Sequence, residues 1–267
     1  MSSRLRHVAQ QNAGIEEAGR YTAADGSEVV IRELLAAALA GTVLHQPEEG
    51  LRPPRTDLEP VVEVTAEGSL DAARRLGAGA AVLNFASARN PGGGYLGGAR
   101  AQEEDLCRHA LLHPTLLRAP EYYAAHRASD DLRYSDRVIW SPGVPIHRGP
   151  DGGLLARPVL ADFLTCPAPN AGELLRREPD AGPSVDAVLR RRAGRVLAVA
   201  AHHGATRLVL GAWGCGVFRN DPAAVADAFG EQLDGPFAGA FEHVVFAVWD
   251  RAEPSANRTA FERRFGA

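Results

Sequence analysis

A glycine-rich stretch between two ordered elements constrains this chain more than any other feature. The apolar run at residues 80–86 predicts a buried strand, and residues 105–112 predict the opening of a helix. Between them lie five glycines, at positions 92, 93, 94, 97 and 98. Glycine adopts positive φ freely and lets the backbone approach a ligand closely. We therefore predict an α/β protein whose ligand crevice lies where strands end in such loops.

Two adjacent carboxylates, Glu103 and Glu104, follow this loop where the helix begins. Neighbouring helical side chains point about 100° apart, so the pair cannot easily enclose a bond from opposite faces, as paired glycosidase carboxylates do. We expect one acid–base group and one group that orients the substrate. A helix N-terminus lowers a carboxylate pKa, whereas burial and a like charge raise it, and the sequence leaves this balance open. The alternative is that acidic residues are simply favoured in a first helical turn.

Apolar periodicity and chain breakers predict the other elements. We expect strands at residues 61–65, 137–140, 207–210 and 243–248, a hairpin over 144–163, helices at 1–24, 70–76, 186–201 and 261–265, and loops at 47–60 and 167–183. Ser69 is the expected N-cap of the helix at 70–76. The strand–helix–strand order at 61–86 predicts parallel pairing with a right-handed crossover. Pro114 should end or bend the helix from Glu103 near His113.

A second glycine loop follows the strand at 207–210. Gly211, Gly214 and Gly216 precede a helix that should begin at Asp221-Pro222. Free backbone donors and a positive helix end suit a diphosphate, although a tight turn alone would also explain these glycines. The spacing is not that of the G-x-G-x-x-G fingerprint, so a nicotinamide cofactor is disfavoured.

Cysteine and histidine patterns predict no metal site. Cys215 is more typical of a small residue tolerated between glycines than of a nucleophile. His109 and His113 have the spacing of metal ligands on one helical face, but no H-E-x-x-H motif accompanies them, which favours a surface or capping role. His202 and His203 are expected as cations near a helix C-terminus.

Composition excludes several classes of protein. The chain has no lysine, which excludes Schiff-base, pyridoxal-phosphate and P-loop chemistry. The net charge of -4 provides no basic footprint for duplex nucleic acid. No apolar run reaches the roughly 18 residues of a membrane span, and the N-terminus lacks the apolar region of a signal peptide. We therefore expect a cytoplasmic protein that does not associate with membranes.

The pattern Gly92-Gly93-Gly94, seven residues, then Gln102-Glu103-Glu104 resembles the catalytic signature of poly(ADP-ribose) glycohydrolase. Residues 84–87 and 211–222 resemble its compact bacterial branch. The resemblance implies a macrodomain-like, three-layer α/β/α fold with a mixed central sheet. It also implies an N-terminal helical extension, residues 1–60, packed on a catalytic core, residues 61–267.

The resemblance also implies roles for individual residues. Glu104 would be the general acid and base, and Glu103 would orient the ribose hydroxyls. Phe218 would pack on the ribose, or in the core if its role is purely structural. The remaining predicted substrate-binding residues supply backbone donors, close approach or amide groups: Asn84, Asn90, Gly92, Gly93, Gly94, Gln102, Gly214, Cys215, Gly216 and Val217. The scheme requires no metal and no cofactor.

The function implied is hydrolysis of the ribose–ribose O-glycosidic bond of poly(ADP-ribose), releasing ADP-ribose. The expected partners are ADP-ribose and poly(ADP-ribose) or ADP-ribosylated macromolecules, and the expected state is a monomer. One alternative is a hydrolase of mono-ADP-ribose linked to protein or nucleic acid. Another is a non-catalytic macrodomain that binds ADP-ribose. The intact Gln102-Glu103-Glu104 favours an enzyme, because a binding module has no need of the acid.

Overall fold

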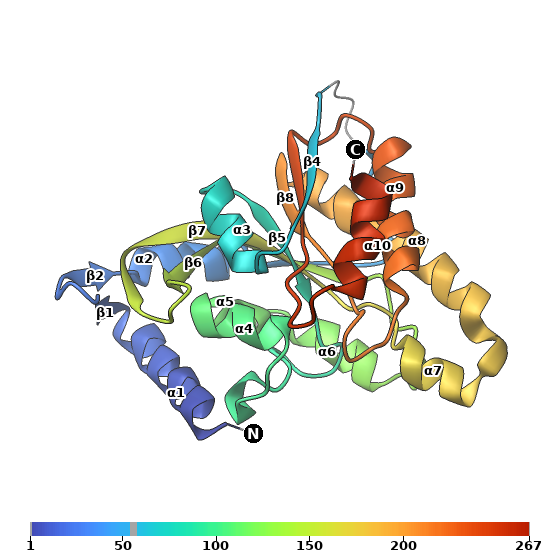
Figure 1. Ribbon diagram of the computed structural model, residues 1–267. Helices are drawn as coiled ribbons and strands as arrows, with labels where there is room; N and C mark the ends of the chain where they lie inside the picture. The colour runs from blue at the N-terminus through green and yellow to red at the C-terminus, as the bar shows by residue number, and fades with distance from the viewer. Residues whose placement is uncertain (1, 54–57, 267) are drawn as a thin grey trace.

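A single mixed sheet determines where the other elements lie. The computed structural model describes residues 2–53 and 58–266. Its main sheet has seven strands in the order β3-β6-β7-β5-β8-β9-β4 (Figure 1). Their bounds are Val43–His45 (β3), Val61–Thr65 (β4), Ala81–Phe85 (β5), Val138–Arg148 (β6), Leu154–Cys166 (β7), Arg207–Leu210 (β8) and His243–Ala247 (β9).

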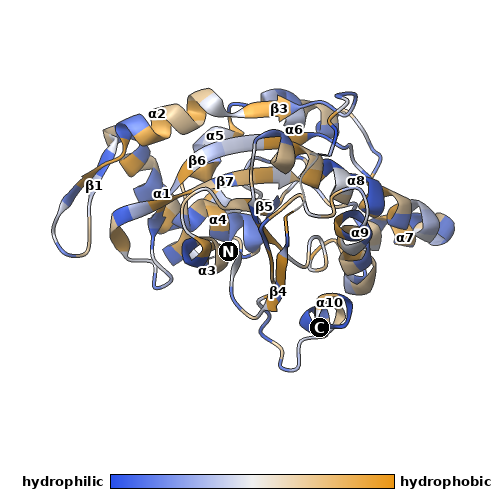
Figure 2. Cartoon of the chain, turned by 90° about the horizontal axis from the view of Figure 1, so that it is seen from above, coloured by the Kyte–Doolittle hydropathy of each residue, from blue (hydrophilic) through white to orange (hydrophobic). Residues whose placement is uncertain are grey.

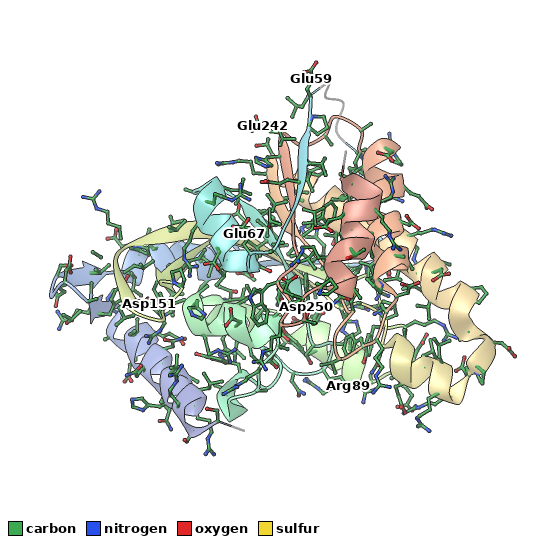
Figure 3. All side chains as sticks on the ribbon, viewed as in Figure 1. Glu59, Glu67, Arg89, Asp151, Glu242 and Asp250 are labelled. Carbon is green, nitrogen blue, oxygen red and sulfur yellow. The ribbon has the colours of Figure 1, made fainter. Side chains whose placement is uncertain are left out.

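Strand direction gathers several strand ends at one edge of the sheet. The neighbours from β7 through β5, β8 and β9 to β4 are parallel, whereas β6 is antiparallel to both β7 and β3. In Figure 3, Arg89 and Asp250, which follow β5 and β9, lie at the opposite end of these strands from Glu59 and Glu242, which precede β4 and β9. The carboxyl ends of β5, β8 and β9 therefore share the edge at which open α/β sheets bind ligands.

Helices cover both faces of the sheet (Figure 1). The first set is α1 (Ser3–Ala18), α2 (Arg32–Gly41), α3 (Ser69–Leu76), α4 (Gln102–His109), α5 (Leu112–Leu116) and α6 (Pro120–Arg127). The second set is α7 (Ala171–Arg177), α8 (Gly182–His202), α9 (Pro222–Asp234) and α10 (Ala256–Phe265). A separate two-stranded sheet joins β1 (Arg20–Thr22) to β2 (Glu28–Val30), and 3-10 turns occur at Tyr95–Gly97 (η1) and Pro179–Ala181 (η2).

Alternation along the strands builds one core on each face. In β9, Val244 and Phe246 belong to the core under the second helix set, whereas Val245 belongs to the core under the first. Successive strand residues point to opposite faces, which produces this alternation. Figure 2 shows β3 and β4 in hydrophobic colours and the outer end of α7 in hydrophilic colours. The predicted three-layer arrangement with a mixed sheet is confirmed.

Several local predictions are wrong. The strands at 61–65 and 80–86 run in the same direction but do not pair, because β8 and β9 lie between them. Ser69 is the first residue of α3 rather than its N-cap, which is Gly68, and the Ser69 hydroxyl accepts a hydrogen bond from Gln102 instead. The helix predicted for residues 1–24 ends at Ala18, after which β1 pairs with β2.

Two more element boundaries differ from prediction. Residues 167–183 are not a loop: they contain α7 and η2, because Ala171 and Leu174 bury apolar surface and the Asn170 side chain accepts a hydrogen bond from the Glu173 amide. The helix that carries the two glutamates ends at His109, four residues before His113.

The first sixty residues contribute more than helices. β3 belongs to this segment and joins the main sheet beside β6. The division into an extension and a core at residue 60 stays a prediction, and residues 54–57 of the predicted loop at 47–60 lie outside the described residues. Among the helices of the described residues, none is both long and apolar enough to cross a membrane.

Candidate active site

The two glycine loops lie next to each other at the shared edge of the sheet. β5 leads into the loop at residues 86–101, and its parallel neighbour β8 leads into the loop at 211–221. A Cβ atom placed on Gly211 would lie 3.2 Å from Cζ of Phe85, the last residue of β5. Both loops therefore begin from adjacent strand ends and can contact one ligand between them.

Gln102 fixes the start of α4 to the end of β5. Its side-chain oxygen accepts a hydrogen bond from the Phe85 amide at 2.9 Å. Its nitrogen donates to the Leu83 carbonyl at 2.8 Å and to the Ser69 hydroxyl at 3.1 Å. These contacts use both polar groups of the amide to anchor the helix that carries Glu103 and Glu104. A contact between Gln102 and substrate stays a prediction.

Glu103 is a buried carboxyl group surrounded by donors. It is 3% exposed, accepts a hydrogen bond from the Ser87 amide at 2.7 Å and accepts another from Asn84 Nδ2 at 3.3 Å. Burial raises the pKa of Glu103 to about 8, although these donors favour the charged form, and the neighbouring Glu104 charge adds to the rise. Glu103 therefore retains a proton near neutral pH.

Glu104 has one anchored oxygen and one unpaired oxygen. Its Oε1 accepts a hydrogen bond from the Gly94 amide at 2.8 Å. Its Oε2 is buried and has no hydrogen-bond partner within the described residues. Buried polar atoms are nearly always paired, so an unpaired one often marks a functional group. The arrangement fixes the carboxyl group in space while leaving one oxygen available for proton transfer.

Gly93 has no Cβ, and this lets the glycine loop pass close to both carboxyl groups without a steric clash. Its φ is 57°, and a Cβ atom there would lie 2.5 Å from Glu104 Oε1 and 3.1 Å from Glu103 Oε2. A real Cβ essentially never approaches an oxygen so closely. Glycine at this position therefore allows both carboxyl groups to face the loop backbone.

The two predicted asparagines have different environments. Asn84 is fully buried, and its Nδ2 also donates to Thr165 Oγ1 at 3.2 Å, while its Oδ1 has no partner within residues 2–53 and 58–266. Asn90 is exposed, and its backbone carbonyl accepts a hydrogen bond from the Gly93 amide at 3.0 Å. Asn84 thus contacts Glu103 from the buried side, whereas Asn90 lies at the start of the glycine turn.

The second loop presents free backbone donors. In the part of the chain that the structure describes, the amides of Gly214, Gly216, Val217 and Phe218 donate no hydrogen bond. The Cys215 amide differs, because it donates to the Ala212 carbonyl at 3.1 Å. Clustered free amides form an anion-binding concavity of the kind that suits a diphosphate.

Residues around the second loop hold its shape. The Asn220 side chain donates to the Pro169 carbonyl at 2.8 Å and to the Gly214 carbonyl at 3.1 Å. Phe218 is half-buried, contacts the core, and lies 5.9 Å from the Tyr134 ring. Burial raises the pKa of the Cys215 thiol to about 12, which keeps it neutral and unsuited to nucleophilic attack.

Two expectations about histidines are wrong: the shared helical face of His109 and His113, and the cationic state of His203. His109 is the last residue of α4 and His113 belongs to α5, so the two do not share a helical face. Burial, together with the nearby His45 and His202, lowers the pKa of His203 to about 4, so His203 is neutral rather than cationic. His203 instead stacks on Trp140 at 4.5 Å. Within the described residues, no group of three or more His, Cys, Asp or Glu side chains is placed to hold a metal ion.

Sequence reasoning missed several residues that build the site. The Ser87 amide donates to Glu103, and the Thr165 hydroxyl accepts a hydrogen bond from Asn84, which also contacts Glu103. Neither residue belongs to a sequence pattern that predicts such a role. Asn12 was detectable, because it occupies the buried face of α1 between Ala9 and Ile15. A cavity of about 490 Å³ lies beside α1 and β1, and no residue of either glycine loop lines it. The site is therefore identified by the loops and the two carboxyl groups rather than by this cavity.

Comparisons with known proteins agree with this geometry. Residues 9–149 match a family model described as the catalytic domain of microbial-type PARG. A crystal structure of poly(ADP-ribose) glycohydrolase (PARG) from Thermomonospora curvata superposes with a TM-score of 0.93 at 49% identity, covering 99% of this chain and 100% of that one. No curated protein matches the chain.

Two further crystal structures contain ligands. The Thermomonospora curvata enzyme bound to the inhibitor ADP-HPD gives a TM-score of 0.92 at 48% identity, covering 99% of this chain and 100% of that one. The enzyme from Deinococcus radiodurans in complex with ADP-ribose gives a TM-score of 0.81 at 49% identity, covering 86% of this chain and 96% of that one.

Proposed function

The chain belongs to the microbial-type PARG family, and on that premise we propose that it hydrolyses the ribose–ribose O-glycosidic bond of poly(ADP-ribose), releasing ADP-ribose. The resemblance stated from the sequence is confirmed by the extent of the match, which reaches 99% of the chain. The monomeric state and the cytoplasmic location expected from the sequence stay predictions.

One observation carries the proposal: the environment of Glu104. The Gly94 amide holds one carboxyl oxygen at 2.8 Å, and the other oxygen is buried without a partner in the described residues. Glu103, in contrast, accepts hydrogen bonds from Ser87 and Asn84. Of the four carboxyl oxygens of Glu103 and Glu104, only Glu104 Oε2 has no donor among the described residues. This supports Glu104 as the group that donates a proton.

The reaction then follows from the positions of the two acids. Glu104 donates its proton to the leaving ribose oxygen as the bond to the anomeric carbon breaks, producing an oxocarbenium-like centre. The Glu104 carboxylate next accepts a proton from water, and this restores the acid. The oxygen of the same water bonds to the anomeric carbon. Glu103 orients the ribose hydroxyls. The diphosphate of the same ADP-ribose unit stabilises the positive charge, so a second flanking carboxylate is unnecessary.

The second loop supplies the binding energy for the diphosphate in this proposal. The free amides of Gly214, Gly216, Val217 and Phe218 are its donors. The Cys215 amide is not one of these donors, because it already donates to the Ala212 carbonyl. Phe218 packs on the ribose face from the same loop.

Gly214→Ala should weaken ADP-ribose binding by at least about tenfold, since one displaced hydrogen bond to a charged ligand is worth about 1.5–3 kcal/mol. Gly214 has a φ of 72°, and a Cβ atom would collide with Ala168 Cβ and lie 2.5 Å from Asn220 Nδ2. Gly204→Ala is the matched control, with a φ of 74° and no atom within 4 Å. Calorimetric titration with ADP-ribose measures both, and equal affinities in the two variants would contradict the binding role.

The rate should depend on the protonation state of Glu103, the neighbour of the proposed acid. Because burial raises the pKa of Glu103 to about 8, Glu103 keeps its proton at pH 7 and loses it as the pH rises. We therefore expect kcat/KM to be highest near neutrality and to fall about tenfold per pH unit above about 8. A pH profile from 6 to 10, with ADP-ribose affinity measured at each pH, checks this. A flat profile to pH 10 would contradict a role for the Glu103 proton in the reaction.

Incubation with labelled poly(ADP-ribose) tests the activity itself. The expected product is ADP-ribose, identified by chromatography. Mono-ADP-ribosylated protein and nucleic acid are assayed in parallel, and cleavage of these substrates alone would assign a different linkage. Binding of ADP-ribose by the wild-type protein without any turnover would identify a binding module and contradict the proposal.

A further inference from the structure

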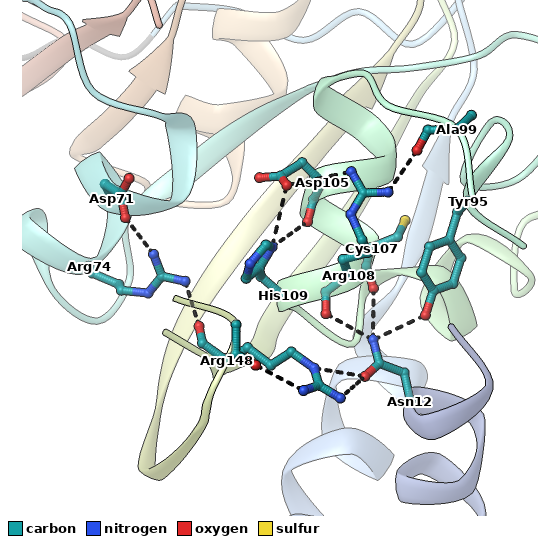
Figure 4. A network of polar contacts seen from close by, with 11 residues as sticks. Asn12, Asp71, Arg74, Tyr95, Ala99, Asp105, Cys107, Arg108, His109 and Arg148 are labelled. Atoms are coloured by element: carbon teal, nitrogen blue, oxygen red, sulfur yellow. Dashed lines mark hydrogen bonds and ion pairs between the residues drawn. The ribbon is translucent and has the colours of Figure 1, made fainter. Parts of the chain in front are cut away.

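One buried side chain of helix α1, Asn12, forms hydrogen bonds with both the glycine loop and α4. Asn12 is 3% exposed although it carries an amide. Its Nδ2, which carries two hydrogens, lies within hydrogen-bond distance of three acceptors: the Tyr95 hydroxyl at 3.1 Å, the Cys107 carbonyl at 3.2 Å and the Arg108 carbonyl at 2.9 Å. Figure 4 shows these contacts converging on Asn12 from the glycine loop and from the end of α4. A single amide group therefore joins three segments of the chain.

The orientation of the Asn12 amide is determined by its other neighbours. Asn12 Oδ1 accepts hydrogen bonds from Arg148 Nε at 3.1 Å, from Arg148 Nη2 at 2.9 Å and from His147 Nε2 at 3.0 Å. Arginine is only a donor, so the oxygen must face Arg148 and the nitrogen must face the carbonyls. The described residues include no carboxylate paired with Arg148, which makes the Asn12 oxygen its main acceptor.

The two groups that Asn12 holds are those that orient Glu104. Tyr95 directly follows Gly94, whose amide anchors Glu104 Oε1. The Cys107 and Arg108 carbonyls belong to the last turn of α4, where helical carbonyls lack intrahelical partners. Arg108 in turn donates to the Ala99 carbonyl at 2.8 Å, within the same loop. Asn12 thus sets the distance between the glycine loop and the helix that carries the acid.

We propose that Asn12 is a positioning residue for the reaction, acting from the N-terminal helix through Tyr95 and α4 on the Glu104 carboxyl group. The inference rests on the proposed function, because it concerns the geometry of that acid. A shift of about 1 Å in a catalytic group can cost about 10²-fold in rate. The N-terminal helix is then part of the structure that sets the rate.

Asn12→Asp tests the proposal, because it keeps the shape and the acceptor facing Arg148 but replaces the donor with an oxygen facing two carbonyls. We expect kcat to fall by about 10- to 100-fold, with KM and the ADP-ribose affinity changed less than about threefold. Tyr95→Phe, which removes only the loop contact, should lower kcat by a smaller factor. Its effect should shrink in an Asn12→Ala background, because removing the amide breaks the same connection.

Gln11→Ala is the matched control, since this neighbouring side chain on α1 contacts Arg148 but neither Tyr95 nor α4. It should leave kcat unchanged. A fall in thermal stability of Asn12→Asp with an unchanged kcat would show a merely structural role and overturn the proposal.

Hydrogen exchange of the Gly94 amide supplies a measurement that does not depend on activity. This amide donates to Glu104, so it should exchange faster in Asn12→Asp than in the wild type and in Gln11→Ala. Unchanged exchange would overturn the positioning role. If the wild type fails to cleave poly(ADP-ribose), the proposed function fails, and the exchange rates still decide whether Asn12 positions this contact.

Discussion

Replacing Glu104 by glutamine should slow the release of ADP-ribose from polymer by about 10²- to 10⁴-fold, the contribution of one positioned proton-transfer group. Glutamine keeps the size of the side chain, and its oxygen can still accept the hydrogen bond from the Gly94 amide. It cannot donate a proton to a leaving oxygen and then recover one from water. The measurement is kcat on labelled poly(ADP-ribose), with ADP-ribose affinity measured on the same preparations.

Asp105→Asn is the matched control for this substitution. Asp105 is the next acid on α4, but it is exposed and forms ion pairs with Arg108 and His109. The control should retain wild-type kcat within about threefold, because exposed ion pairs contribute little. Full activity of Glu104→Gln would contradict the assignment of Glu104 as the acid even if the hydrolase activity is real. Loss of ADP-ribose binding together with turnover would indicate a collapsed site instead.

Gly93→Ala should lower kcat by about 10²-fold or more while the protein still folds. The new Cβ would lie 2.5 Å from Glu104 Oε1, so either the carboxyl group or the loop must move and the Gly94 hydrogen bond must change. A displacement of about 1 Å at a catalytic group is enough for a loss of this size. The measurement is kcat together with the free energy of unfolding.

Gly143→Ala separates the clash from the backbone strain. Gly143 has a φ of 58°, almost identical to the 57° of Gly93, and an added Cβ would meet no atom within 4 Å. Both variants should lose about 1–2 kcal/mol of stability from the left-handed backbone. Only Gly93→Ala should lose turnover. Similar kcat values for the two variants would show that the close approach of Gly93 to the carboxyl groups has no catalytic role.

The sequence predicted the elements that depend on residues close together in the chain. The strand at residues 80–86, the glycine turn and the two acids after it were identified because apolar runs and glycine carry local conformational preferences. The pairing of the strands was not predictable in this way. β4 and β5 are separated by β8 and β9, whose residues lie more than a hundred positions later in the chain.

The chemical state of each group depended on distant neighbours. His203 looked like a cation at a helix end, yet it stacks on Trp140 and its pKa is lowered to about 4 by burial and by His45 and His202. Gln102 was predicted to contact substrate, which stays a prediction, and the structure adds that its amide forms hydrogen bonds with Phe85, Leu83 and Ser69. In both cases the partners of the side chain come from other elements, which residue type alone does not reveal.

The opening glycine stretch shows the same division. The sequence by itself determined that a flexible backbone would precede two acids at a helix start, because glycine content and the order of residues are local properties. Only the tertiary structure decided that Glu103 is buried among donors, that Glu104 keeps an unpaired oxygen, and that Asn12 connects both supporting segments. Desolvation and hydrogen bonding depend on which residues meet in space, and no local pattern encodes that information.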